Sequence, residues 1–394
     1  MTDIKLNYDD ITIVPEVLTD IESRSECDPY TEDGYLPIFA SPMTSVVSFD
    51  NVKDFNNARI MCVIPRSYSL NDRLMYMFST NGNVNFVSFS LKEAEDVFLI
   101  NSDAERYNLM RRFMIGASEI ENLDDIKYPF RMCIDLANGH MRKLLDVVKG
   151  IKKMWGGSIE IMTGNIANPK TYEEYEKAGV DFCRLSVGTG SVCSTSSNVG
   201  VHYSIFSLLS EVYEIKKKIN GKCKIIADGG IKGFRDIQKA LIYADYVMIG
   251  GLFNKAIESA GKTTYGKSYF NIRGYKILRP FKTLFTYGKE IKRKDFESVY
   301  KRVKSGKLTV FKELFGQSTK IAQAIVASAN SQTLKSLKTS EGLFKYQKVE
   351  YTLKGWSDNE TDFLRSAMSY TDSKTLDDFK ESQWIQITKR AYNE

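Results

Sequence analysis

The sequence predicts an α/β protein, a single TIM-type (β/α)8 barrel, and three observations lead to that prediction. Short runs rich in β-branched and aromatic residues recur between residues 37 and 253, and a helix-like segment follows each run. Several runs are apolar almost throughout, as in Cys223-Lys224-Ile225-Ile226-Ala227, which is typical of parallel strands covered on both faces. Glycines stand at the ends of five runs, where barrel enzymes carry their binding loops.

Nine segments have the character of barrel strands, although a closed barrel of this type needs only eight. In chain order they are residues 37–41, 60–65, 84–90, 113–117, 131–136, 160–164, 182–187, 224–227 and 246–249. Only one of 84–90 and 113–117 can be the third barrel strand, and the sequence leaves that choice open.

The chain changes character after the last predicted strand. Residues 254–314 are polar and aromatic, with Lys-Glu-Ile-Lys-Arg-Lys-Asp at 289–295. We interpret them as an insertion, and a solvated charged helix and loop explains them more simply than a separate binding module. Residues 320–345 are predicted to form a mobile active-site loop, and the remaining tail a helix packed against the barrel. The whole chain, 1–394, is expected to form one catalytic domain.

Composition is that of a reduced, soluble enzyme. The 394 residues carry 55 lysines and arginines against 49 acidic residues; a net charge of +6 does not indicate nucleic-acid binding but suits a phosphorylated substrate. Six cysteines without a C-x-x-C pair indicate reduced thiols rather than disulfides. The polar start and the lack of an apolar run of about 20 residues argue against a signal peptide or membrane span. We therefore expect a cytoplasmic protein.

The most informative stretch is Gly188-Thr189-Gly190-Ser191-Val192-Cys193-Ser194-Thr195, which places Cys193 in a glycine-rich turn directly after a predicted strand. Glycines permit positive φ and close approach, and successive N–H groups of such a turn form a concavity for an oxyanion or a phosphate. A cysteine at a strand end is by itself more often a packed thiol. The glycine-rich surroundings favour a nucleophile.

The other strand-end glycines point to a phosphorylated ligand. They lie in Asn138-Gly139, Gly164-Asn165, Gly229-Gly230 and Gly250-Gly251. The last two pairs follow the predicted seventh and eighth strands, where barrels commonly bind phosphate through backbone N–H groups and a helix N-terminus.

Together these motifs resemble the IMP dehydrogenase and GMP reductase family. The Cys193 turn is similar to the family's catalytic-cysteine loop. The companion motifs follow in the family's order: Asp135-Leu136-Ala137-Asn138-Gly139, Met162-Thr163-Gly164-Asn165-Ile166, Ile226-Ala227-Asp228-Gly229-Gly230-Ile231, Val247-Met248-Ile249-Gly250-Gly251 and Phe315-Gly316-Gln317-Ser318. The likeness runs from Leu6 to about Gly355, apart from the insertion.

Within the family, several features favour the reductase branch. The stretch after the second strand is too short for the CBS domains that dehydrogenases usually carry, and residues 320–338 lack the Arg-Tyr pair with which dehydrogenases hydrolyse their intermediate. Residues 199–203 resemble the reductase sequence Thr-Gly-Val-Gly-Tyr, and residues 338–342 resemble Arg-Ala-Ser-Glu-Gly. The alternatives are an IMP dehydrogenase and a non-catalytic sensor of purine nucleotides.

The resemblance implies an NADPH-dependent (or NAD-dependent) oxidoreductase that converts GMP to IMP and ammonia through a covalent Cys193 intermediate. It assigns catalysis to Cys193, Thr195 and Glu341. It assigns the purine nucleotide to Ser191, Asp228, Gly229, Gly230, Gly250, Gly251, Gly316, Gln317, Ser318 and Lys338. It assigns the cofactor to Asp135, Asn138, Gly139 and Arg66. It assigns a monovalent cation such as K⁺ to the backbone of Gly188, Gly190 and Cys193. A homotetramer is implied in the same way.

Four departures from the reductase pattern bear on the substrate. Arg66 stands in place of a lysine, His202 in place of a glycine, Ser194 in place of a threonine or isoleucine, and Gln317 in place of a methionine beside the base. An amide near the purine could favour a deoxynucleotide or a modified guanine, because buried hydrogen bonds discriminate strongly between base edges.

Overall fold

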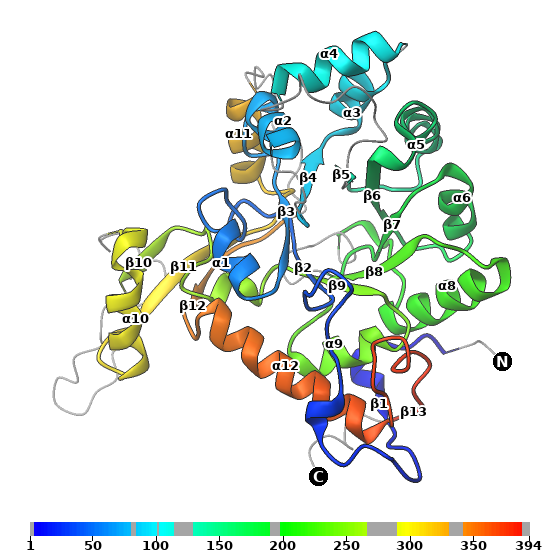
Figure 1. Ribbon diagram of the computed structural model, residues 1–394. Coiled ribbons are helices and arrows are strands. Elements are labelled where there is room, and N and C mark those ends of the chain that lie inside the picture. The colour runs from blue at the N-terminus through cyan, green and yellow to red at the C-terminus, as the bar shows by residue number, and fades with distance from the viewer. Residues whose placement is uncertain are drawn as a thin grey trace.

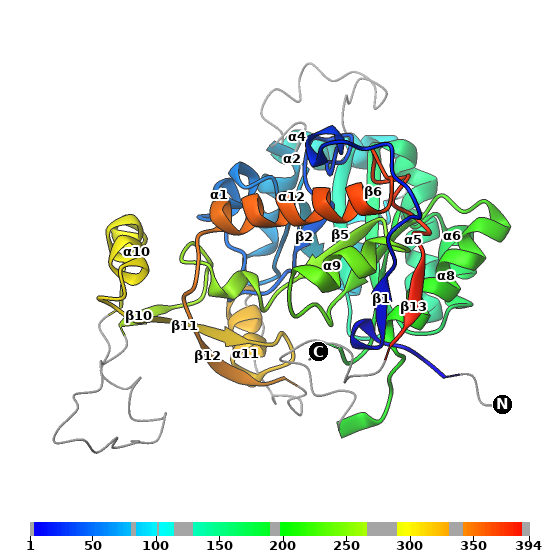
Figure 2. The same ribbon diagram turned by 90° about the horizontal axis from the view of Figure 1, so that it is seen from below.

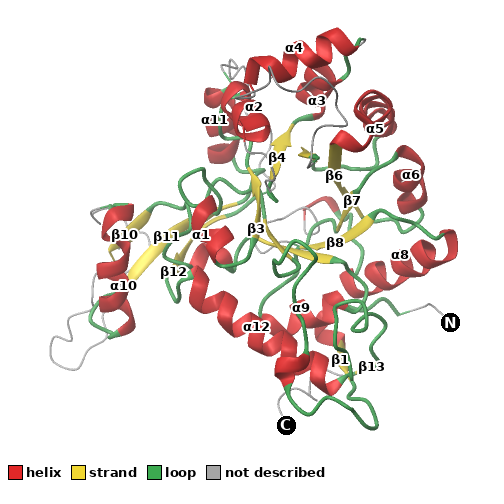
Figure 3. Ribbon diagram, in the orientation of Figure 1, coloured by secondary structure: helices red, strands yellow, loops and turns green. Residues whose placement is uncertain are grey.

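Eight parallel strands close into a barrel in the computed structural model, which describes residues 4–79, 84–100, 102–113, 129–189, 198–265, 290–330 and 342–387 (Figure 1; Figure 3). The strands follow one another around the barrel in chain order, and the last pairs with the first. They are β2 (Ile38–Ala40), β3 (Met61–Ile64), β4 (Phe86–Phe89), β5 (Phe130–Asp135), β6 (Ile159–Ile166), β7 (Phe182–Leu185), β8 (Lys224–Asp228) and β9 (Tyr246–Ile249). The predicted (β/α)8 fold is confirmed.

The third barrel strand is β4, which pairs with β3 on one side and β5 on the other. The segment 84–90 therefore supplies the strand that the sequence left undecided. Its rival begins with Phe113, the last residue of helix α4 (Asp103–Phe113), and residues 114–117 lie outside the described part of the chain. Ser90 ends the strand by capping helix α3 (Leu91–Phe98), because its hydroxyl accepts from the N–H of Glu93.

Helices cover the outside of the barrel (Figure 1). Besides α3 and α4 they are α1 (Val52–Asn57), α2 (Leu70–Ser79), α5 (Arg142–Trp155), α6 (Thr171–Ala178), α8 (Ile205–Ile219), α9 (Phe234–Leu241) and α12 (Leu353–Tyr370). In α5 the buried residues Leu144, Val147, Val148 and Ile151 recur at spacings of three and four, so that one stripe faces the strands. The predicted helical tail is α12. Among the helices of the described residues, none combines the length and apolar character that a membrane span requires.

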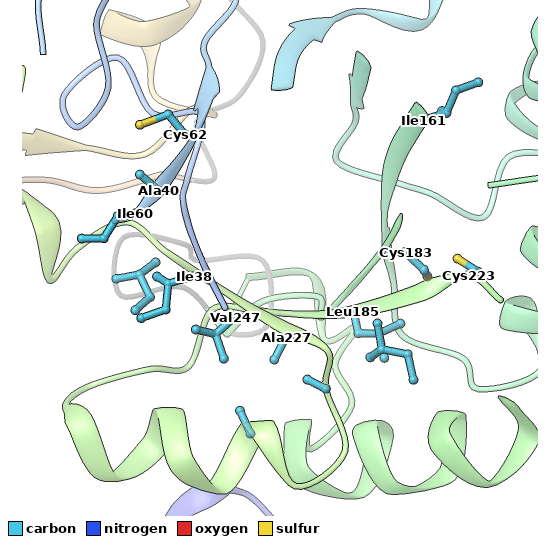
Figure 4. Packing of buried hydrophobic residues seen from close by; sticks show 14 of the residues in the cluster. Ile38, Ala40, Ile60, Cys62, Ile161, Cys183, Leu185, Cys223, Ala227 and Val247 are labelled. Atoms are coloured by element: carbon cyan, nitrogen blue, oxygen red, sulfur yellow. The ribbon is translucent and has the colours of Figure 1, made fainter. Parts of the chain in front are cut away.

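The side-chain alternation of the strands produces two apolar layers. Residues such as Val247 and Ala227 point from the barrel toward the surrounding helices, as Figure 4 shows. The residues between them in sequence point inward and fill the barrel: Phe39, Met61, Val63, Phe86, Cys133, Met162, Phe182, Ile226 and Met248. Because successive side chains of a strand alternate in direction, the residue two positions further along each strand also points inward.

The segment after the barrel forms a small sheet that projects to one side (Figure 1; Figure 2). Strands β10 (Thr263–Tyr265), β11 (Val310–Phe315) and β12 (Phe344–Lys348) are antiparallel, and helix α10 (Phe296–Lys304) accompanies them. The region expected to be only a charged helix and loop thus also contains strands, because alternate residues of β11 are buried. Helix α11 (Lys320–Ala329) occupies the start of the segment predicted as a loop. At the chain ends, β1 (Ile11–Ile13) pairs with β13 (Trp384–Gln386).

A buried lysine ties β11 to the segment that leads into β10. Lys312 of β11 is fully buried, and its ammonium group donates to Thr263 Oγ1 at 2.7 Å, to Gly261 O at 3.2 Å and to Ser259 O. Burial lowers the pKa of Lys312 to about 7, although Glu258 opposes this shift. The ammonium group therefore titrates near neutral pH in the folded protein.

The stability of the protein is expected to rise with pH through this lysine. In the unfolded chain a lysine has a pKa of about 10.4, so between about pH 7 and pH 10 the unfolded state binds more protons at this site than the folded state. From pH 7 to pH 9 the free energy of unfolding should rise by about 2 kcal/mol relative to Lys312→Met. Urea unfolding of both proteins at each pH measures this difference, and a constant difference would contradict the titration.

Candidate active site

A cluster of charged side chains lies inside the barrel at the C-terminal ends of its strands. Asp135 ends β5 and Asp228 ends β8, while Arg184 is the third residue of β7. Each stands two positions after an inward-pointing residue, Cys133, Ile226 and Phe182 respectively, so the alternation of the strands turns all three side chains into the barrel.

Arg184 joins the two carboxylates. Its Nη1 donates to Asp135 Oδ1 at 2.8 Å, and its Nε and Nη2 donate to Asp228 Oδ2 at 2.9 and 2.8 Å. Asn165 Nδ2 adds a further bond to Asp228 Oδ2 at 2.7 Å, and Arg66 Nε lies 3.7 Å from Asp135 Oδ2. Two guanidinium groups thus balance two carboxylates.

Asp135 and Arg184 are both charged at neutral pH. Burial alone would raise the pKa of Asp135, but Arg184 and Arg66 lower it below its ordinary value. Burial would likewise lower the pKa of Arg184, but Asp228 and Asp135 raise it further above its ordinary value. Such a pair is costly to break, because a carboxylate left alone in this site would be desolvated without a partner.

Gly164 leaves the space that the ion pair between Arg184 and Asp135 requires. In the sheet register it lies opposite Asp135 on β5 and opposite Arg184 on β7. A Cβ at this position would come within 2.5 Å of Arg184 O and 2.7 Å of Arg184 Cβ, and Gly164 has a φ of +150°. Only glycine therefore lets Arg184 approach across β6 toward Asp135.

Asp228 keeps one carboxylate oxygen for a ligand. All three side-chain donors converge on Oδ2, and no described residue donates to Oδ1. The next two residues, Gly229 and Gly230, have φ of +98° and +76°. A carboxylate oxygen followed by two left-handed glycines can accept from a hydroxyl group and present N–H groups to an anion.

A small cavity lies beside this turn. It has a volume of about 340 Å³, and its lining includes Thr189, His202, Gly230 and Lys232. The hydroxyl groups of Thr189 and Ser186 are 2.5 Å apart, which ties the start of the predicted cysteine loop to the end of β7. Asp9, Asp10 and Asp236 also line the cavity, and Lys232 Nζ is paired with Asp9 Oδ2 at 2.7 Å, so its lining is of mixed charge.

The glycine pair after β9 approaches the first barrel loop closely. A Cβ on Gly250 would lie 2.5 Å from Met43 Sδ and 3.5 Å from Ser41 Cβ. Gly250 O accepts from the N–H of Asn254, and Gly251 follows in the same turn. The loops after β2 and β9 therefore meet at this rim.

The loop after β5 is bound to the loop after β6. Gly139 N–H donates to Asn165 O at 2.9 Å, and a Cβ on Gly139 would approach that oxygen to 2.8 Å. His140 N–H donates to Asn138 Oδ1, and His140 Nε2 accepts from Ala167 N–H at 3.1 Å. Burial lowers the pKa of His140, which agrees with an acceptor nitrogen. This histidine holds two loops together.

The segment after β11 reaches the barrel rim. The side-chain amide of Gln317 donates to Pro42 O, and Gly316 N–H donates to Leu343 O at 3.2 Å. Ser318 O accepts from Gln323 Nε2 at 3.0 Å. The predicted base-reading residues therefore stand beside the loop that follows β2, with the NH₂ group of Gln317 already bonded to the protein.

The structure brings together some of the predicted residues. Asp135, Arg66 and Asp228 belong to one ionic cluster, and Gly188, with a φ of +78°, lies in the turn after β7. Six predicted site residues lie outside the described part of the chain: Gly190, Ser191, Cys193, Thr195, Lys338 and Glu341.

Sequence reasoning missed Arg184 and the role of Asn165. The available signal was a single arginine within an otherwise apolar strand, two positions after an inward-pointing phenylalanine. Because a charge is rarely buried without a partner, such a residue indicates a site or an ion pair.

These features define a (β/α)8-barrel enzyme with its site at the C-terminal ends of the strands. A sequence model of the IMP dehydrogenase / GMP reductase domain matches residues 121–306. The chain is 28% identical over 279 residues to a GMP reductase of Buchnera aphidicola subsp. Schizaphis graminum, which covers 68% of this chain and 73% of the relative. It is 27% identical over 267 residues to a GMP reductase of Caenorhabditis elegans, covering 65% and 69%, and 28% identical over 271 residues to GMP reductase 1 of Homo sapiens, covering 66% and 72%.

The chain is therefore similar to the IMP dehydrogenase / GMP reductase family. This similarity supports an oxidoreductase that uses a nicotinamide cofactor.

Proposed function

We propose that the protein catalyses the NADPH-dependent reductive deamination of GMP, or of a related guanine nucleotide, to IMP and ammonia. The observation that carries this proposal is the cluster in which Arg184 joins Asp135 and Asp228 at 2.8 Å each. It holds two charged carboxylates side by side at the mouth of one barrel, one for each of the two substrates that a nucleotide reductase must bring together.

The purine nucleotide is assigned to the Asp228 side of the cluster. Asp228 Oδ1 accepts from the ribose hydroxyl groups, because Oδ2 already receives bonds from Arg184 and Asn165. The phosphate group is assigned to Ser191, Gly229, Gly230, Gly250 and Gly251, and the base to Gly316, Gln317, Ser318 and Lys338. The left-handed turn at Gly229 and Gly230 supports the phosphate assignment.

The chemistry is assigned to Cys193 on the basis of the family resemblance. The thiolate adds to C2 of the purine, and the C2–N bond breaks as ammonia leaves with a proton supplied through Thr195 and Glu341. A hydride then adds to C2, and the carbon–sulfur bond breaks, which gives IMP and restores the thiolate. In sum, GMP, NADPH and two protons give IMP, NADP⁺ and an ammonium ion.

The nicotinamide dinucleotide is assigned to the Asp135 side. The donor set fits this group, since Asp135 offers a charged acceptor and Arg66 a charged donor, and their side chains are 14% and 30% exposed. Asn138 and Gly139 complete the assignment. When bound, the dinucleotide supplies the hydride for the reduction. The protein residues orient it and keep their own charges balanced.

Three finer properties follow from the same resemblance. A monovalent cation such as K⁺ is held by backbone carbonyl groups of Gly188, Gly190 and Cys193, and the left-handed conformation of Gly188 agrees with a turn of this kind. The chain associates as a homotetramer. The protein works in the cytoplasm, in keeping with the free, buried thiols of Cys27, Cys62, Cys133, Cys183 and Cys223.

Product analysis tests the proposed reaction. Purified protein incubated with GMP and NADPH is expected to yield IMP and ammonia in equal amounts, measured by chromatography and an ammonia assay. Formation of XMP from IMP and NAD⁺, without conversion of GMP, would instead identify a dehydrogenase. A protein that binds the nucleotides and converts neither would be a sensor.

A further inference from the structure

Arg73 of helix α2 is a fully buried cation whose hydrogen-bonding capacity is completely used. Its Nε donates to Tyr68 O at 3.0 Å, and its Nη1 donates to Ser88 O at 2.6 Å and to Glu93 Oε2 at 3.2 Å. Its Nη2 donates to Glu93 Oε1 at 2.6 Å and to Asn330 Oδ1 at 3.0 Å. The five N–H donors of the guanidinium group thus have five acceptors.

The charge of this arginine is compensated by Glu93 of helix α3. Burial alone would raise the pKa of Glu93, but Arg73 and Ser90 lower it. The ion pair therefore persists at neutral pH, in a forked geometry that fixes both side chains. A buried ion pair of this kind contributes little net stability compared with apolar packing. Its main effect is therefore to fix the positions of the groups that it contacts.

Asn330 connects this pair to the active-site rim. It follows the last turn of α11, and its Oδ1 accepts from Arg73 while its Nδ2 donates to Val326 O at 2.8 Å and to Arg66 O at 3.3 Å. The side chain of Arg66 in turn lies 3.7 Å from Asp135. A continuous series of polar contacts thus runs from the buried arginine to the carboxylate that faces the dinucleotide.

We propose that Arg73 and Asn330 are positioning residues for the dinucleotide side of the active site. Arg73 fixes the orientation of the Asn330 amide, Asn330 fixes the backbone of Arg66, and Arg66 then presents its guanidinium group to Asp135 and to the dinucleotide. The purine side lies further along the same contacts, because Asp135 and Arg184 stand between Arg66 and Asp228, and Asp228 is also held by Asn165. This inference rests on the proposed function for the identity of the ligand.

Two substitutions of Asn330 separate positioning from simple structural support. Asn330→Ala removes all three bonds of the amide, to Arg73, Val326 O and Arg66 O. Asn330→Asp keeps an oxygen acceptor for Arg73, strengthened by charge, but places a second oxygen against Arg66 O. Ser328→Ala, at an exposed position of the same helix, is the matched control. Urea unfolding establishes that each variant is folded.

The dissociation constants of NADPH and GMP are measured by fluorescence and calorimetric titration. For both Asn330 variants we expect the NADPH constant to rise about three- to tenfold, in line with the loss of the one hydrogen bond to Arg66 O, with the GMP constant changed much less and Ser328→Ala equal to the wild type. An Asn330→Asp protein that binds NADPH as the wild type does would overturn the inference, as would an equal weakening for both ligands. A wild type that binds NADPH but does not reduce GMP would refute the proposed function alone, and one that binds no NADPH would refute both.

Discussion

Replacing Arg184 by methionine is expected to lower kcat/KM about a hundredfold and the free energy of unfolding by about 3–5 kcal/mol. The substitution leaves Asp135 and Asp228 within the barrel without the cation that both contact at 2.8 Å. One or both carboxylates must then take up a proton or turn away, so neither substrate retains its acceptor in the right place. Steady-state kinetics and urea unfolding at neutral pH measure the two effects.

Arg131→Met provides the matched control for this prediction. Arg131 lies at the opposite end of β5, its side chain is 15% exposed, and it pairs with Glu160 at 2.7 Å and Asp33 at 3.1 Å. Its loss should reduce stability while leaving kcat/KM of the folded protein unchanged. Equal losses of activity in both variants would show that Arg184 acts through stability alone and would contradict its role in the site.

Replacing Cys193 by alanine is expected to reduce turnover at least about a thousandfold while leaving the dissociation constant of GMP within a few-fold of the wild-type value. The variant lacks the sulfur atom that forms the covalent bond to C2, whereas the groups assigned to ribose and phosphate remain. Single-turnover kinetics measures the loss. Mass spectrometry of acid-quenched wild-type protein should detect a purine adduct on the peptide that contains residue 193.

Cys133→Ala is the control for the nucleophile. Cys133 Sγ lies only 3.7 Å from Arg184 Nη1, yet burial raises the pKa of this thiol to about 12, so it stays protonated at neutral pH. We expect this variant to keep most of its turnover. Loss of turnover in Cys133→Ala together with activity in Cys193→Ala would reverse the assignment.

The barrel was predictable because its strands are continuous apolar runs with glycines at their ends. The choice between residues 84–90 and 113–117 as the third strand was not predictable, because both runs are short and apolar. The structure distinguishes them, because Phe113 is the last residue of helix α4. The sheet formed by β10, β11 and β12 was missed because its strands pair across segments far apart in the chain. Periodicity within one segment does not reveal such pairing.

The candidate site was predictable as a set of strand-end residues but not as a cluster. Asp135 and Asp228 were assigned to different ligands from their motifs, whereas their link through Arg184 depends on the register that places Gly164 between β5 and β7. The contact between Arg73 and Asn330 joins residues 257 positions apart. The local sequence determines neither the register of neighbouring strands nor the pairing of residues far apart in the chain, so only the folded structure reveals them.

The reductive reaction is tested most directly by the absorbance of reduced nicotinamide in two parallel assays with the wild-type protein. With GMP and NADPH we expect this absorbance to fall, and with IMP and NAD⁺ we expect no rise. A rise with IMP and NAD⁺, together with no change with GMP and NADPH, would contradict a GMP reductase-like reaction and identify the opposite chemistry of the family.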